Sequence, residues 1–198
     1  MATKIIVINR ALTKLGSEKL MSETDNNKAS RTIETIYDGL LDRILRAYRW
    51  AFAIKRVQLA ALADEPVYGF QHQYQLPSDC LRIDAVADNI MHGLRNLPVM
   101  KRPLWQREGN RILTDIDAPL YLRYGARVTD PSQWDASFTD AFCCLLASEM
   151  AEPITQSSTK KQAALQDFEL AIREARQTSA IERPPIQQQD TSWVTARL

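Results

Sequence analysis

The chain has 198 residues, of which 45% are hydrophobic and 25% charged, and its formal net charge is +1. Such a composition is typical of a globular protein whose core needs no disulfide or metal. The balanced charge gives no whole-molecule case for a nucleic-acid or membrane binder. The longest apolar run, residues 141–147, is far shorter than the roughly 20 residues of a membrane span.

Two helices are predicted in the first 52 residues. Thr3 is a suitable N-cap for a helix of about three turns that Gly16 ends. The second helix has the stronger pattern, because its apolar residues keep the i, i+3, i+4 spacing for more than five turns. Trp50 and Phe52 close this segment, and we expect them to anchor it to the core. The apolar residues of the second helix are Ala29, Ile33, Ile36, Tyr37, Leu40, Leu41, Ile44, Leu45 and Tyr48.

The other face of this second helix is charged. We expect that face to be exposed to water or to contact a charged partner, because the apolar face must be the buried one. Its charged residues are Arg31, Glu34, Asp38, Asp42, Arg43 and Arg46.

The middle of the chain is predicted to be rich in strands. Most of the Pro and Gly residues fall between positions 66 and 131, which indicates short segments with tight connections. The firmest element is a hairpin of residues 105–108 and 111–114 around Gly109-Asn110. Further strands are predicted over residues 57–62, 81–86 and 120–124.

Helical periodicity returns after Asp130-Pro131. One helix is predicted with Asp135 as its N-cap and Pro153 as its end. A last helix is predicted to begin at Thr155 or a nearby Ser, with an inward face made of Leu165, Phe168, Ile172 and Ala175.

These elements predict an α+β fold: a four-helix bundle with a small, mostly antiparallel sheet inserted between the second and third helices, and an extended C-terminal arm. We expect one domain over residues 1–180, with helical parts at 1–52 and 132–180 and a β-rich insertion at 53–131. Residues 181–198 contain Pro184-Pro185 and a Gln run, which cannot continue a helix. Because Trp193 lies near the end of this segment, we interpret it as an arm that docks on a partner.

No catalytic motif is found, and we expect neither an enzyme nor a bound cofactor or metal. His72 and His92 lack further ligands at chelating spacing, so exposed histidines are the simpler interpretation. Cys143 and Cys144 are adjacent in a helix and are expected to pack in the core. Together with Cys80 they make an odd number of cysteines, which indicates a reduced, cytoplasmic history.

Carboxylates offer only weak signals of chemistry. Asp115-x-Asp117 has the oxygen ligands that a divalent cation prefers, but it precedes Ala118-Pro119, where a turn is expected. A pair for glycoside hydrolysis would need two carboxylates a few ångströms apart, and the sequence cannot place any two together. The candidates for such a pair are Asp84, Asp88, Glu108 and Asp115.

One stretch, residues 95–127, is basic. It carries seven Lys or Arg against three Asp or Glu, a net charge of +4. With Trp105, Tyr121 and Tyr124 nearby, a basic sheet could stack nucleic-acid bases. The alternative, which we favour, is a solvated sheet face or a protein interface, since Arg, Trp and Tyr are enriched at protein hot spots.

The order of several short motifs resembles the tail tubular protein A family, the head-to-tail adaptor or gatekeeper proteins of short-tailed bacteriophages and related prophages. The resemblance covers nearly the whole chain, although each motif is loose. The motifs, in chain order, are Trp50-Ala51-Phe52, residues 74–82 (YQLPSDCLR), 107–113 (REGNRIL), 118–124 (APLYLRY), the Asp130-Pro131 turn before two helices, and 191–197 (TSWVTAR).

This resemblance implies a structural role in the virion. Such proteins form a ring, commonly dodecameric, between the portal of the capsid and the tail nozzle, and DNA passes through the lumen without sequence-specific binding. The implied location is the neck of the virion, and the host cytoplasm during assembly. The partner interface would then include Arg31, Asp38, Asp42 and Arg46 on the second helix, Arg173 on the last helix, and Trp193, Val194 and Arg197 in the arm.

Two other classes remain as alternatives. Tail components of phages sometimes hydrolyse cell-wall or capsular glycans, so a tail-associated glycan hydrolase is the second interpretation, although no acid/base pair is recognisable. A free-standing DNA-binding regulator would need a helix-turn-helix pattern with a basic helix, and neither is evident.

Overall fold

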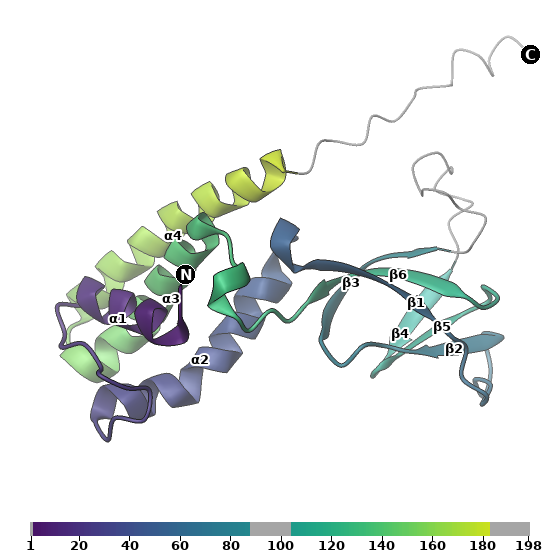
Figure 1. The fold of residues 1–198 in the computed structure, drawn as a ribbon, viewed down its shortest axis with the longest axis horizontal. Helices are drawn as coiled ribbons and strands as arrows, with labels where there is room; N and C mark the ends of the chain where they lie inside the picture. The colour runs from purple at the N-terminus through teal and green to yellow at the C-terminus, as the bar shows by residue number, and fades with distance from the viewer. Residues whose placement is uncertain (1, 88–103, 183–198) are drawn as a thin grey trace, which may run out of the picture. The chain divides into compact units, whose positions relative to one another are not determined.

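The part of the chain that the structure describes has four α-helices and two small antiparallel sheets, an α+β fold that confirms the predicted fold class. The computed structural model describes residues 2–87 and 104–182. The chain divides into two compact units, Met1–Ile54 with Gly125–Arg183 and Lys55–Tyr124, which we call the helical unit and the β unit. Figure 1 shows the four helices in the helical unit and the strands that form the β unit.

Each of the first two helices begins at a side-chain cap, and the cap at Thr3 is the predicted one. Thr3 accepts a hydrogen bond from the backbone N–H of Ile6 at the start of α1 (Lys4–Lys14). Asn27 accepts one from the N–H of Ser30 at the start of α2 (Lys28–Ala47). Each cap satisfies a backbone donor that has no partner within its helix. Gly16, with φ +66°, ends the first helical segment in a left-handed conformation that a side chain would disfavour.

The third helix, α3 (Ala136–Thr155), is the centre of the helical unit, and α1, α2 and α4 (Ser158–Ile181) pack against it. It is capped by Asp135, as predicted. The prediction that Pro153 ends α3 is wrong, because the helix continues to Thr155 and ends where Gln156 adopts φ 52°. A proline in an exposed last turn removes only one intrahelical hydrogen bond, and this cost is smaller there than in a buried helix interior.

The fourth helix begins after Ser157, whose side chain accepts a hydrogen bond from the N–H of Lys160. Its predicted inward residues Ile172 and Ala175 are buried, but Leu165 is 47% exposed, so its predicted inward position is wrong. The smaller Ala164 takes the inward position instead. One residue corresponds to about 100° around a helix, which is enough to move Leu165 to the edge of the contact with α3.

Aromatic rings fill the core of the helical unit. The ring of Phe138 on α3 lies 4.8 Å from that of Trp50, 4.9 Å from that of Phe52 and 5.3 Å from that of Trp134, measured between centroids. The Trp50 indole N–H donates to the carbonyl of Ile44, 2.9 Å away. The expectation that Trp50 and Phe52 anchor the end of α2 is therefore confirmed.

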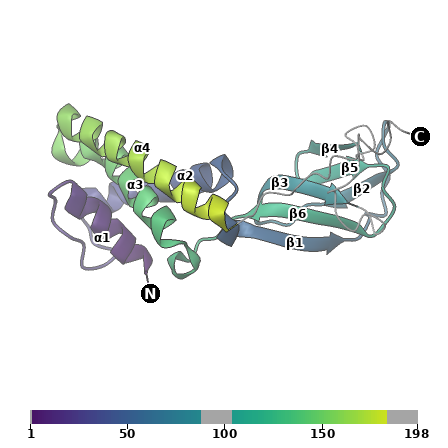
Figure 2. The ribbon, with the colours of Figure 1, turned by 90° about the horizontal axis from the view of Figure 1, so that it is seen from above.

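The β unit contains two three-stranded sheets, with strand orders β1-β6-β3 and β2-β5-β4, where the sequence predicted one (Figure 2). The predicted hairpin is confirmed as β4 and β5, with Glu108 opposite Arg111 and Trp105 opposite Thr114. The six strands are β1 (Ile54–Leu59), β2 (His72–Gln75), β3 (Cys80–Ala87), β4 (Trp105–Glu108), β5 (Arg111–Thr114) and β6 (Leu120–Ala126).

Two strands differ from the prediction. The strand predicted over residues 57–62 starts earlier and ends at Leu59, because its extent depends on pairing with β6. The short and polar β2 was not predicted. It is a strand because it pairs with β5, which places Tyr74 opposite Ile112 in the core. Neither pairing leaves a local signal in the sequence.

Candidate functional site

The charged face of α2 is the strongest candidate for a contact surface in the helical unit. Arg31, Asp38 and Arg46 are exposed and Asp42 is half-buried, and their spacing of seven, four and four residues places them on one side of the helix. The opposite side contributes the buried residues of α2, among them Ile33, which also explains why the helix forms in this sequence.

Two of these residues already bind an arginine of the same chain. The guanidinium of Arg127 donates from Nη2 to Oδ1 of Asp38 (3.0 Å) and from Nε to Oδ1 of Asp42 (2.5 Å). The hydrogen bond to Asp42, together with the negative charges of both carboxylates, raises the pKa of Arg127. The role of the two Asp residues within the chain is therefore to hold the segment after β6 against α2. The sequence does not show this role, because any of many arginines could bind two Asp residues spaced by four.

Arg31 on α2 and Arg173 on α4 are more available. Both side chains are exposed, and neither has a hydrogen-bond or ion-pair partner within residues 2–87 and 104–182. Arg46 is exposed as well. The remaining predicted interface residues, Trp193, Val194 and Arg197, lie outside the described residues.

Each outer helix of the bundle is joined to α3 by one ion pair at the surface. Arg43 on α2 contacts Glu149 (Nη2–Oε1 3.1 Å). The other two ion pairs join Arg10 on α1 to Asp140 and Lys161 on α4 to Glu152. Such exposed pairs add little stability individually. In these three pairs, one charged residue of each outer helix is bound to α3.

The aromatic platform considered for the β unit is not assembled. Tyr124 is buried, and its hydroxyl donates to Oδ1 of Asp79 at 3.0 Å. Burial, followed by the hydrogen bond and the charge of Asp79, raises the pKa of Tyr124 to about 12. Trp105 and Tyr121 are more exposed, but they lie in different sheets. The placement of these three rings therefore does not support the less favoured alternative, a single surface that stacks nucleic-acid bases.

The basic stretch is also divided. Arg127 belongs to the helical unit and is bound by Asp38 and Asp42. In the β unit, Arg111 donates from Nη1 to Oε1 of Gln73 at 2.9 Å. The net charge of this stretch therefore does not describe one continuous basic surface.

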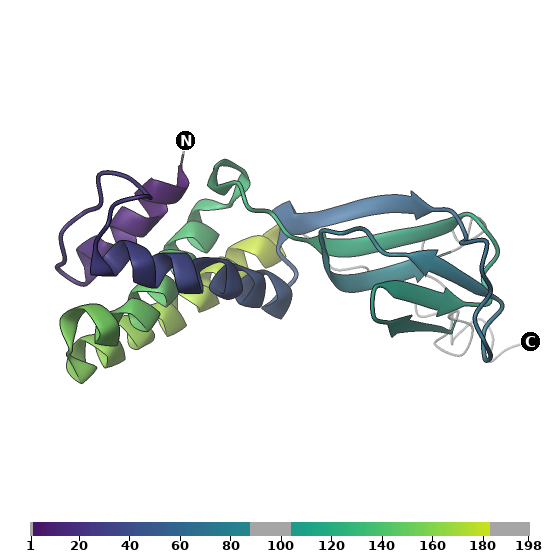
Figure 3. The same cartoon turned by 90° about the horizontal axis from the view of Figure 1, so that it is seen from below.

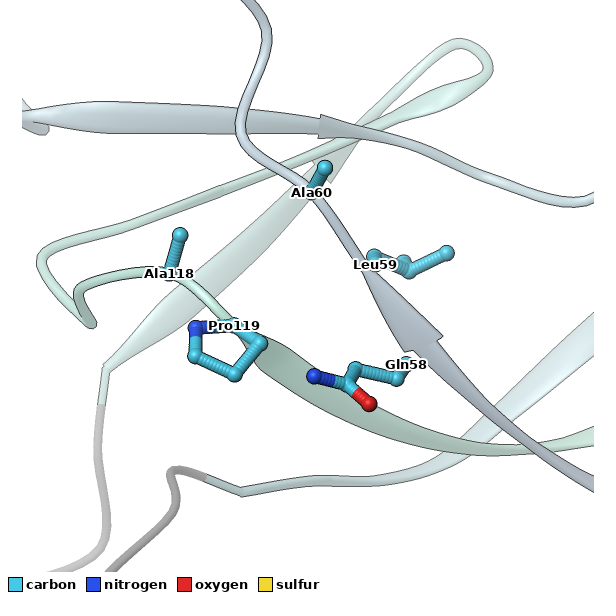
Figure 4. Close-up of a pocket in the computed structure, with 5 residues that line it drawn as sticks. All are labelled: Gln58, Leu59, Ala60, Ala118 and Pro119. Carbon is cyan, nitrogen blue, oxygen red and sulfur yellow. The ribbon is translucent and has the colours of Figure 1, made fainter.

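A shallow pocket of about 430 Å³ lies in the β unit (Figure 4). Figure 4 shows Gln58 and Leu59 at the end of β1 and Pro119 just before β6 around it. Ala60 and Ala118 complete the lining. The amide of Gln58 is the only polar side-chain group among these five residues, and they offer no nucleophile or acid/base pair.

The predicted chemical candidates are placed as follows. His72 lies 3.0 Å from Asp117 (Nε2–Oδ1), and Asp115 accepts a hydrogen bond from the N–H of Gln71. Over residues 2–87 and 104–182, no three His, Cys, Asp or Glu side chains are placed to hold a metal ion. His92 and Asp88 lie outside the described residues.

The cysteines occupy different surroundings. Cys143 and Cys144 are buried in α3 and Cys80 on β3 is half-buried, and all three are free thiols. Burial raises the pKa of Cys143 to about 12, so this thiol stays protonated at neutral pH. The expectation that Cys143 and Cys144 pack in the core is confirmed.

No protein-family model matches this chain, and no curated protein matches it significantly. In the described part of the chain, no helix has the length and apolar character to cross a membrane.

Proposed function

We propose that this chain is a structural adaptor between the head and the tail of a short-tailed bacteriophage, of the tail tubular protein A type. In this proposal, copies of the chain form a ring between the portal and the tail nozzle, and DNA passes through the ring. The family suggested by the motif order supplies the biological role. The structure supplies surfaces that suit it.

The observation that carries the proposal is the pair of long exposed faces on α2 and α4. Both helices pack against α3, and each keeps charged residues outward, such as Arg31 on α2 and Arg173 on α4. A subunit of a rotational ring contacts one neighbour through one surface and the other neighbour through a different surface. Two distinct exposed helix faces on one unit meet this requirement.

If each contact between subunits is weak, the ring would assemble only after the portal is present. The free chain would then be monomeric at low concentration, and the portal would gather the copies into a ring. An arm at the C-terminus that binds only the portal would make ring formation depend on it.

Light scattering tests this proposal. The purified full chain is measured alone at micromolar concentration and again with a portal ring from the same genome. We expect a monomer alone and a multi-subunit ring on the portal. A stable small oligomer whose mass does not change with portal would overturn the proposal.

The arm is tested separately by deleting residues 183–198, which leaves α4 complete. We expect unchanged helical circular dichroism and loss of portal binding. A matched control replaces the same residues by a Gly/Ser linker of equal length, which separates the sequence of the arm from its length. Full portal binding by the deleted chain would contradict the role of the arm.

A further inference from the structure

Gly39 is an unusual residue for its position. It lies in the middle of α2 on the exposed side, and a Cβ built there meets no other atom within 4 Å. Glycine destabilises a helix interior relative to alanine. Nothing within the described chain requires the absence of a side chain at this position, and the space above Gly39 on the outer face of α2 is open.

Leu170 has the opposite property. It lies on α4, 66% exposed, on the side of the helix that faces away from α3. It follows Leu165 by five residues, so the two leucines are about 140° apart around the helix, and Leu165 lies nearer the contact with α3. Leu170 is therefore a projecting apolar side chain on a face that carries mostly polar residues.

We propose that Leu170 of one copy packs over Gly39 of a neighbouring copy, so that the outer face of α4 meets the outer face of α2. The inference rests on the proposed function in taking neighbouring copies to be related by rotation within a ring. Such a contact is heterologous, since it joins two different surfaces of identical chains, and repetition can close it. A small residue at the crossing lets the two helices approach closely, as ridge-into-groove packing requires.

The directions of the helices fit this contact. Figures 1 and 3 show that α2 and α4 run in the same direction within the helical unit. The rotation between neighbours in a ring of many copies is small, so α2 of one copy and α4 of the next would remain nearly parallel.

Charge complementarity favours a second copy as the occupant. With Leu170 over Gly39 and the helices parallel, the residues three positions further along, Arg173 and Asp42, lie at the same height. Asp42 uses Oδ1 to accept from Arg127, and within the described residues its Oδ2 has no hydrogen-bond partner. The guanidinium of Arg173, which has no partner within the described residues, would then lie at the height of this carboxylate oxygen across the contact.

The one like-charge pair at this register is already compensated. Glu169 and Asp38 precede Leu170 and Gly39 by one residue and would lie at the same height. Asp38 is bound by Nη2 of Arg127 at 3.0 Å, which reduces its repulsion of a second carboxylate.

Sedimentation of the full chain up to about 1 mM tests the contact. We expect weak association of the wild type, and we expect both G39L and L170E to raise its dissociation constant at least about tenfold. G39L should melt at the same or a higher temperature, because the space above Gly39 is open and leucine favours helix. L165E, a matched control on the same helix, should associate like the wild type. The exchange variant G39L/L170A should recover part of the lost association, because it moves the projecting side chain to α2.

A wild type that is monomeric at about 1 mM, or a G39L or L170E variant that associates like the wild type, would overturn the contact. The deletion of residues 183–198 identifies another occupant: if it alone abolishes association, those residues form the contact and the inference fails. Portal binding is measured on the same variants at micromolar concentration. A chain that binds the portal but fails the sedimentation test disproves only the α2–α4 contact, whereas one that passes sedimentation but ignores the portal disproves the adaptor proposal.

Discussion

The helical unit and the β unit are stabilised in different ways. In the helical unit three helices pack against a central helix that is buried along residues 141–148, and aromatic rings around Phe138 fill the space between them. In the β unit, individual polar contacts join separate segments: Tyr74 donates to the carbonyl of Ile116 at 2.6 Å, and Lys55 and Tyr124 both donate to Asp79. The helical unit therefore has a core centred on aromatic rings, whereas the buried apolar residues of the β unit are accompanied by polar contacts that join its segments.

This difference bears on function. Because α3 supplies most of the buried contacts of the helical unit, the outer faces of α2 and α4 contribute little to its core. Residues there can serve contacts with other molecules at small cost to folding. In the β unit, by contrast, Tyr124, a candidate for base stacking from the sequence, is buried and donates a hydrogen bond to Asp79.

The largest effect is expected from F138A. Removing this fully buried ring should destabilise the helical unit by about 3–5 kcal/mol, because it leaves a cavity among four other aromatic rings. Hydrogen exchange followed by mass spectrometry measures the two units separately. Faster exchange in α2 and α3 with little change in β4 and β5 is the expected pattern. Equal acceleration in both units would contradict the comparison.

A smaller effect is expected from G109A in the β unit. Gly109 has φ +56° in the turn between β4 and β5, a conformation that costs a residue with a Cβ roughly 1–2 kcal/mol. The exchange protection of the hairpin should fall while that of α3 is unchanged. G39A is a suitable control, because Gly39 lies in a regular helix with open space around it and alanine should stabilise the helical unit. A hairpin as protected in G109A as in the wild type would show that the turn is not under this constraint.

The polar contacts of the β unit predict a dependence on pH. Burial acts to raise the pKa of Asp79, but the hydrogen bonds from Lys55 and Tyr124 outweigh it, and the net result is a pKa below the usual 3.8. A lowered carboxyl pKa contributes stability above pH 3.8, and this contribution is lost as the pH falls through the folded-state value.

Y124F should therefore destabilise the β unit by about 1 kcal/mol at pH 7. It should also reduce the loss of stability between pH 4 and pH 2, because Asp79 then has one hydrogen bond fewer in the folded state. Urea unfolding at a series of pH values measures both effects. D79N provides the comparison, since it removes the titrating group. A Y124F profile with the same slope as the wild type would show that Tyr124 does not act on Asp79.

The smallest effect is expected from the surface ion pair between Arg43 and Glu149. Both side chains are about half exposed, at 56% and 42%, so their coupling should be no more than about 0.5 kcal/mol. A double-mutant cycle of R43A and E149A, measured by urea unfolding at low and high salt, determines this coupling. A coupling above about 1.5 kcal/mol would show that the helical unit also depends on individual polar contacts.

Strong local signals in the sequence were sufficient to predict several elements. The cap at Thr3, the long amphipathic pattern of α2, the cap at Asp135 and the hairpin at Gly109-Asn110 all appear in the structure where they were expected. Each of these depends on neighbouring residues, and the physical preferences of caps, helix faces and tight turns act over that range.

Residues of the candidate interface were predictable only in part. The periodicity of α2 identifies its exposed charged face, but it does not reveal that Asp38 and Asp42 bind Arg127, 85 or more residues away. Gly39 lies inside the helical pattern of α2, but that pattern alone gives it no role. The periodicity of the last helix places Leu170 opposite its predicted inward face, and the structure shows this side chain 66% exposed.

The sequence by itself determined the fold class, most helix boundaries and the strongest turn, because these follow from interactions within a few residues. Only the tertiary structure decided that β2 is a strand, that Leu165 is exposed while Ala164 is buried, and that Tyr124 is committed to Asp79. These outcomes depend on contacts between segments that are distant in the chain. A shift of one residue turns a side chain by about 100° in a helix, or to the opposite face of a strand. Periodicity alone does not fix the direction of an individual side chain to within one residue.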